Sequence, residues 1–120
     1  MRKILIVDDQ KNLTFILATS LSKNPNYQVE AVHNGQAAIE CCQQQIFDIV
    51  VADYQLPDMT GVDIAKALLE FSPKTKVIII TALSASMILD SITQGNITHF
   101  LEKPFGLQDF LNVVQEASQD

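Results

Sequence analysis

The chain has 120 residues, a formal net charge of -6 and an apolar fraction of 48%. This length and composition fit one globular domain with its own core, so we expect residues 1–120 to form a single domain. The negative charge and the shortage of basic clusters argue against direct binding to nucleic acid or to an anionic membrane. No apolar run approaches the roughly 20 residues that span a bilayer, and the N-terminus turns acidic too early for a signal peptide. We therefore expect a cytoplasmic protein.

Short runs of β-branched and other apolar residues alternate with longer segments of helical period along the chain. Strands are predicted at 3–7, 28–32, 48–52, 77–81 and 99–103, and helices at about 11–24, 35–45, 60–71, 84–94 and 106–118. Three of the strands are apolar on both faces, as central strands are, whereas Glu30 and Glu102 interrupt the second and the fifth, as in strands nearer an edge. This order predicts a (βα)5 α/β fold with a parallel sheet.

Turn-forming residues separate the predicted helices from the elements beside them. Asn24-Pro25-Asn26 ends the first helix, Asn34-Gly35 begins the second, Ser72-Pro73 closes the third and Gly95 follows the fourth as a C-cap. These breakers indicate a chain without insertions or internal repeats.

Polar side chains follow four of the five predicted strands. Ligands of open α/β sheets bind at the carboxyl ends of the strands, so these side chains are candidates for one shared site. If strands 1, 3, 4 and 5 share that site, strand 2 lies outside them, which predicts the order 2-1-3-4-5 of doubly wound, flavodoxin-like folds. The residues at these strand ends are Asp8 and Asp9, Asp53, Thr81, and Lys103 followed by Pro104.

Each of these residues also has an ordinary role when it is taken alone. Asp9 could be the N-cap of the first helix, Asp53 and Asp58 could be loop residues, Thr81 suits a strand end, and Lys103 could be a surface lysine. The combination is more informative, because carboxylates about 4 Å apart repel one another by about 4 kcal/mol at an effective dielectric constant near 20. A gathering of three therefore requires positive charge, from Lys103 and from a divalent cation.

The candidate ligands are all oxygen atoms, a set that favours a hard ion, Mg²⁺ or Mn²⁺. Cys41 and Cys42 are adjacent, have no partner cysteines elsewhere, and are expected to be reduced thiols. His33 and His99 fall outside the cluster and are expected to be structural or exposed.

The chain resembles the receiver domains of two-component response regulators over essentially its whole length. The resemblance is carried, in the family's order, by Asp8-Asp9, DYQLPDMTG at 53–61, Thr81-Ala82 and FLEKPF at 100–105. It implies that Asp53 accepts a phosphoryl group from a phosphohistidine on a sensor histidine kinase or a phosphotransfer protein. It also implies that Asp9, Asp53 and the backbone carbonyl of Gln55 hold Mg²⁺, and that Asp8 assists through water.

The resemblance assigns further roles around the phosphoryl group. Lys103 and Thr81 neutralise and bind its oxygens, Ala82 leaves room for it, Gln55 and Leu83 flank it, and the Lys103-Pro104 peptide is cis.

The resemblance also implies a switch. Thr81 moves toward the phosphate and Phe100 rotates inward behind it; the alternative role of Phe100 is that of a plain core residue on an edge strand. The segments 84–94, 99–103 and 106–118 would then form the surface that controls a partner or an attached output domain. On this interpretation the chain catalyses its own phosphorylation and dephosphorylation, but it is primarily a signalling switch.

Three other functions compete with this interpretation. A pseudo-receiver that is never phosphorylated would serve only as a protein-binding module. A small phosphatase with an aspartyl nucleophile usually carries an acid two residues later, where this chain has Gln55. A flavin-binding flavodoxin analogue needs glycines and hydroxyls in the first turn, where this chain has DDQKN.

Overall fold

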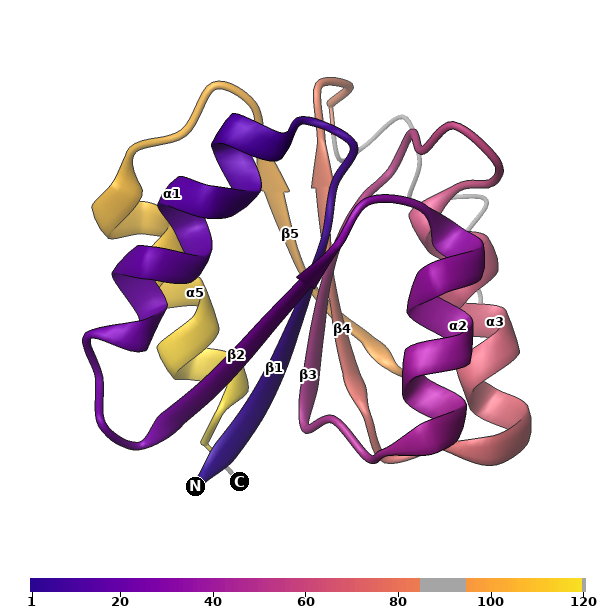
Figure 1. Cartoon of the computed structure of the whole chain (residues 1–120). Helices are drawn as coiled ribbons and strands as arrows, with labels where there is room; N and C mark the ends of the chain where they lie inside the picture. Colours follow the sequence, from indigo (N-terminus) through magenta and orange to yellow (C-terminus); the bar gives the residue numbers. More distant parts are fainter. Residues whose placement is uncertain (85–94, 120) are drawn as a thin grey trace.

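The computed structural model of the chain describes residues 1–84 and 95–119, which contain five strands and four helices (Figure 1). The helix predicted at 84–94, and with it the C-cap role of Gly95, falls outside these residues except at its margins. The elements, in chain order, are β1 (Arg2–Val7), α1 (Lys11–Ser22), β2 (Tyr27–Val32), α2 (Gly35–Gln44), β3 (Ile49–Asp53), α3 (Gly61–Phe71), β4 (Lys76–Thr81), β5 (Ile97–Glu102) and α5 (Leu107–Ala117).

The five strands form one parallel sheet in the order β2-β1-β3-β4-β5, which confirms the predicted topology. Helices α1 and α5 cover one face of the sheet, and α2 and α3 cover the other (Figure 1). The two strands with interrupting glutamates, β2 and β5, lie at the edges as expected. Because all strands run the same way, their carboxyl ends meet along one edge, and this edge carries the candidate site.

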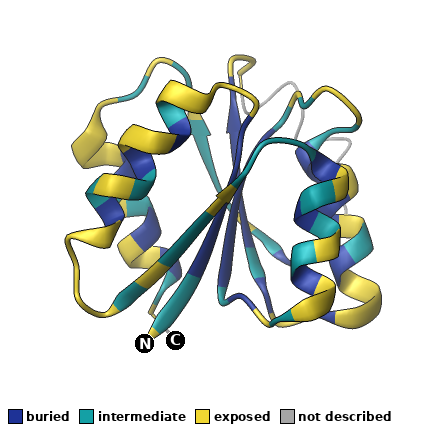
Figure 2. Cartoon of the chain, viewed as in Figure 1, coloured by how far each residue is buried: buried dark blue, intermediate teal, exposed yellow. Residues whose placement is uncertain are grey.

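Two apolar clusters fill the space between the sheet and its helices. Alternate residues of β1 serve the two faces: Leu5 and Val7 pack with α2 and α3, and Ile4 and Ile6 pack with α1 and α5. The strands β1, β3 and β4 are almost wholly buried along their length (Figure 2). A sheet packed on both faces gives the loops at its carboxyl edge a rigid base.

Local sequence correctly predicted some of the helix boundaries. The side chain of Asn34 accepts a hydrogen bond from the Ala37 N–H at 2.8 Å and caps α2, and Ser72 ends α3, as predicted. The N-cap of α1 is Gln10, which makes no side-chain capping bond, so the N-cap role considered for Asp9 is wrong. The Asp9 carboxylate is therefore not occupied with capping that helix.

Two boundaries differ from prediction by two residues. Helix α1 ends at Ser22 rather than at 24, because the Asn24 side chain accepts a hydrogen bond from the Asn26 N–H at 2.9 Å and forms a turn there. Strand β5 begins at Ile97 rather than at 99, because Ile97 already pairs with Val77 of β4. Within the described residues, no helix is both long and apolar enough to cross a bilayer.

Candidate functional site

A cleft of about 500 Å³ opens at the carboxyl edge of the sheet. Side chains and backbone that follow β1, β3, β4 and β5 line it, and β2 contributes none, in agreement with the argument that predicted the strand order. The lining residues are Asp9, Gln10, Asp53, Tyr54, Gln55, Leu56, Pro57, Thr81, Ala82, Leu83 and Lys103.

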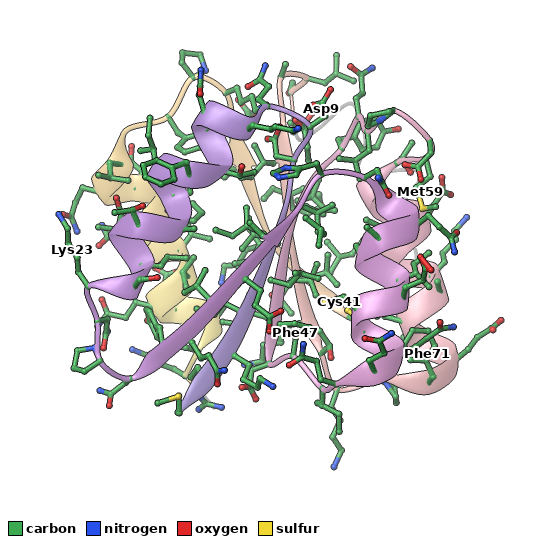
Figure 3. All side chains as sticks on the ribbon, in the orientation of Figure 1. Asp9, Lys23, Cys41, Phe47, Met59 and Phe71 are labelled. Atoms are coloured by element: carbon green, nitrogen blue, oxygen red, sulfur yellow. The ribbon has the colours of Figure 1, made fainter. Side chains whose placement is uncertain are left out.

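Three carboxylates meet at this edge. One oxygen from each of Asp8, Asp9 and Asp53 lies within 4.8 Å of the others. Asp8 is only 2% exposed and Asp53 only 8%, whereas Asp9 is open to solvent. Figure 3 shows Asp9 in the loop above the strand ends. The three oxygens are near enough to share one cation, and they are the hard ligands that Mg²⁺ prefers.

Asp8 carries the clearest sign that the cluster lacks positive charge. Its Oδ1 accepts a hydrogen bond from the Gln10 N–H at 2.9 Å, but its buried Oδ2 accepts none from any described residue. Burial raises the pKa of Asp8 above its usual value; the Gln10 bond lowers it and the neighbouring charge of Asp53 raises it further. A buried carboxylate oxygen that accepts no hydrogen bond, in an acidic cluster, fits a bound cation or a water held by one.

Lys103 is the only cation that the described residues place in the cluster. Its Nζ lies 2.7 Å from Asp53 Oδ2 and 3.6 Å from Asp8 Oδ2. Burial alone would lower the pKa of Lys103, but the hydrogen bond and the charge of Asp53, with a further contribution from Asp8, leave it above its usual value. The ammonium is therefore charged at neutral pH. The Lys103-Pro104 peptide is cis, as the family resemblance implied.

The loop between β3 and α3 is fixed by its own backbone. The Gln55 N–H donates to Asp53 Oδ1 at 3.1 Å, and the Leu56 N–H donates to the Met59 carbonyl at 3.0 Å. Gly61 lies so close to the strand end that a Cβ there would stand 2.7 Å from the Asp53 carbonyl oxygen. Only glycine permits that approach, which brings the end of β3 against the first turn of α3.

Thr81 lies at the floor of the cleft, 1% exposed. Its Oγ1 accepts a hydrogen bond from the Leu83 N–H at 2.9 Å, so the hydroxyl proton is available for donation to another acceptor. Ala82 and Leu83 line the cleft with exposed side chains. Phe100 is half-buried, and it packs against the cluster shared with α2 and α3, which is the core contact considered as its alternative role.

The turn between β2 and α2 contacts the site in a way that sequence reasoning missed. His33 Nδ1 lies 3.0 Å from the backbone oxygen of Asp8. Asp58, considered as an ordinary loop residue, accepts hydrogen bonds from the N–H groups of Gly35 at 2.8 Å and Gln36 at 2.9 Å. These partners are more than 20 positions apart in the chain, so no local sequence signal could have paired them.

Comparisons with known proteins agree on what this fold and site resemble. A family model for the response regulator receiver domain matches residues 4–115. The receiver protein CpdR of Brucella abortus is 28% identical over 97% of this chain and 96% of its own length. Sporulation initiation phosphotransferase F of Bacillus subtilis is 34% identical over 95% of this chain and 91% of its own. The structure of the non-phosphorylated HemR receiver domain from Leptospira biflexa superposes with a TM-score of 0.88 at 29% identity, covering 100% of this chain and 97% of that one.

Proposed function

The chain belongs to the response regulator receiver domain family, and we propose that Asp53 is its phosphoryl acceptor in a reaction that depends on Mg²⁺. One observation carries the proposal: the Lys103 ammonium lies 2.7 Å from an oxygen of Asp53 inside a cleft where two further carboxylates converge. A carboxylate and an ammonium in contact at the mouth of an open cleft form an acceptor with a charge partner for the group it receives.

Phosphoryl transfer requires positioning and charge stabilisation more than covalent chemistry from the protein. A carboxylate oxygen of Asp53 would attack phosphorus as the bond between phosphorus and the donor's imidazole nitrogen breaks. Lys103 would then bind an oxygen of the transferred group, and the free proton of the Thr81 hydroxyl would donate to another. Ala82, with its small side chain in the cleft lining, leaves space beside them.

The residues present fit a hard divalent cation. Asp9, Asp53 and the backbone carbonyl of Gln55 would hold Mg²⁺, and Asp8 would bind it through water. When bound, this ion supplies the positive charge that balances the phosphoryl oxygens and the three carboxylates. The support for this assignment is the all-oxygen donor set and the buried Oδ2 of Asp8, which accepts no hydrogen bond.

Receiver domains of response regulators act between histidine kinases and output domains. For this chain we place the donor among cytoplasmic sensor kinases or phosphotransfer proteins with a phosphohistidine. The output surface would include β5 and α5 together with the segment 84–94, and Phe100 on β5 would respond to Thr81 through packing, since phenylalanine has no hydroxyl.

The test is to incubate the chain with acetyl phosphate and Mg²⁺ and to weigh the intact protein. We expect one phosphoryl group on the wild type, none after Asp53→Asn, and none when EDTA removes the metal. Asp109→Asn is the matched control, because Asp109 is an exposed aspartate in the first turn of α5 outside the cleft. A wild type that gains no mass from acetyl phosphate or from a phosphohistidine donor would instead favour the unphosphorylated binding module.

A further inference from the structure

Residues 33–36, the turn after β2 together with the first two residues of α2 (the β2–α2 turn), supply no side chain to the cleft, yet they contact both loops that carry the acids. On the side of β1, His33 Nδ1 lies 3.0 Å from the Asp8 backbone oxygen. The Asp8 N–H in turn donates to the carbonyl of Val32 at 3.2 Å. The backbone of Asp8 is therefore bracketed by two consecutive residues at the end of β2.

On the other side of the turn, Asp58 reaches across from the loop after β3. Its Oδ1 accepts from the Gly35 N–H and its Oδ2 from the Gln36 N–H, so both oxygens engage the start of α2. The first N–H groups of a helix have no partner within the helix, and a carboxylate there is also favoured by the helix dipole. The two hydrogen bonds lower the pKa of Asp58, so the carboxylate remains ionised at neutral pH.

Met59 adds an apolar contact at the same place. A Cβ built on Gly35 would stand 2.3 Å from Met59 Cγ, so the methionine side chain lies directly against the glycine. Figure 3 shows Met59 near the start of α2. The Met59 carbonyl accepts the Leu56 N–H, which closes the loop one residue after Gln55. A displacement of residues 58 and 59 would therefore also move Gln55, whose N–H donates a hydrogen bond to the Asp53 carboxylate.

We propose that Asp58 is a positioning residue for the metal site, tying the loop after β3 to the β2–α2 turn that also holds the backbone of Asp8. The turn thereby sets the separation between the two loops whose carboxylates would share the cation. This inference rests on the proposed function, because it concerns the same Mg²⁺ site. Residues that orient metal ligands from behind are worth about 10-fold to 100-fold in affinity in well-studied metal sites.

The experiment compares Asp58→Ala with Asn34→Ala. Both changes remove a side-chain acceptor from the first turn of α2, but only the first cuts the link to the loop after β3. Mg²⁺ dissociation constants are measured by calorimetric titration of the purified chain, and phosphorylation by acetyl phosphate is followed over a range of Mg²⁺ concentrations. We expect Asp58→Ala to weaken Mg²⁺ binding about 10-fold, with a larger effect on half-saturation than on maximal rate. Asn34→Ala should bind Mg²⁺ as the wild type does.

Two additional measurements make the result decisive. Amide hydrogen exchange at Gly35 and Gln36 should be faster in Asp58→Ala, and unchanged exchange would show that the two bonds do not exist in solution and would overturn the inference. Asp58→Asn keeps one carbonyl acceptor and should bind Mg²⁺ with an affinity between those of the wild type and Asp58→Ala. If Asp58→Ala does not fold, the Mg²⁺ affinity of Asp58→Asn relative to the wild type tests the inference instead.

The remaining outcomes separate this inference from the proposed function. If Asp58→Ala binds Mg²⁺ within about twofold of the wild type, or if Asn34→Ala weakens binding equally, Asp58 is only a helix cap and the inference is wrong. In both cases the wild type would still bind Mg²⁺ and accept a phosphoryl group. A wild type that binds no Mg²⁺ would overturn the proposed metal and this inference together.

Discussion

Replacing Asp8 with asparagine should stabilise the metal-free protein at neutral pH. The substitution keeps the shape of the side chain and the acceptor for the Gln10 N–H, which donates to Asp8 Oδ1 at 2.9 Å. It replaces the buried Oδ2, which accepts no hydrogen bond, with an amide NH₂ that can donate to the neighbouring Asp53 carboxylate. The substitution would thus exchange a functional residue for one that makes the protein more stable, as is common where a site buries unfavourable charge.

The structure sets the size of this effect. At an effective dielectric constant near 20, Asp53 within 4.8 Å repels Asp8 by at least about 3.5 kcal/mol, while Lys103 at 3.6 Å attracts it by about 4.6 kcal/mol. These two terms nearly cancel. What remains is the unfavourable loss of hydration of a carboxylate that is 2% exposed, which costs several kcal/mol, and the favourable hydrogen bond to this charged group, which contributes about 2 kcal/mol. We expect a gain of about 1–2 kcal/mol, which at 120 residues corresponds to a rise in Tm of about 4–8 °C.

The pH dependence follows from the direction of the pKa shift. Because the folded-state pKa of Asp8 is raised, its protonated form is favoured by folding. That favourable contribution is fully present below the unfolded value of 3.8 and is lost as the pH rises through the folded pKa. The difference in stability between Asp8→Asn and the wild type should therefore be largest near pH 7 and should shrink as the pH falls toward 4.

The assay is urea unfolding of both proteins in EDTA at several pH values, repeated in millimolar Mg²⁺. Mg²⁺ should stabilise the wild type more than Asp8→Asn, since it binds the folded acid cluster and scarcely the unfolded chain. If Asp8→Asn has the stability of the wild type at pH 7 in EDTA, or a lower one, burial of this charge is not unfavourable and the reasoning fails.

Three further results are expected. Thr81→Ala should slow phosphoryl uptake about 10-fold by removing a donor to a charged group, whereas Thr81→Ser should retain most of the rate, as measured by intact mass over time; equal rates would exclude a role for the hydroxyl. Gly61→Ala should lower the free energy of unfolding by about 1–3 kcal/mol because its Cβ would meet the Asp53 carbonyl. Gly95→Ala, whose Cβ would have no described residue within 4 Å, is the control in the same urea titration. Burial raises the pKa of Cys42 to about 12, so iodoacetamide should leave Cys42 unmodified in the folded protein at pH 8 and alkylate it in urea; rapid alkylation of the native chain would contradict this.

The sequence was sufficient for the sheet and for the acids, the threonine and the lysine that meet at its carboxyl edge. Apolar runs on both faces located the ends of β1, β3 and β4 within one residue, and the polar residues at the strand ends implied the strand order. Bounds were less accurate where a boundary depends on pairing rather than on local pattern. Strand β5 begins at Ile97 because β4 supplies a partner for it, which a window of sequence around Ile97 does not reveal.

The contacts behind the site were not predictable for a related reason. Asp58 and Asn96 are short polar residues in loops, and such residues usually serve the turn in which they stand. In the folded chain Asp58 bonds the start of α2, and the buried Asn96 amide donates to the Ala65 carbonyl of α3 at 2.9 Å. Both partners are supplied by a neighbouring element of the tertiary fold. A carboxylate or amide in a loop therefore has many candidate partners in sequence, and only the packing of the layers selects one.

The way in which the fold buries its acids favours a bound cation. Lys103 is shared between Asp8 and Asp53, so a single ammonium faces two buried carboxylates and the exposed Asp9. A phosphoryl group on Asp53 would add negative charge at the position that Lys103 already has to balance. Without a further cation, the added charge would draw Lys103 away from Asp8 and leave that carboxylate buried without any positive neighbour among the described residues. Phosphorylation and cation binding should therefore favour each other, because water does not reach the buried Asp8 carboxylate to screen its charge.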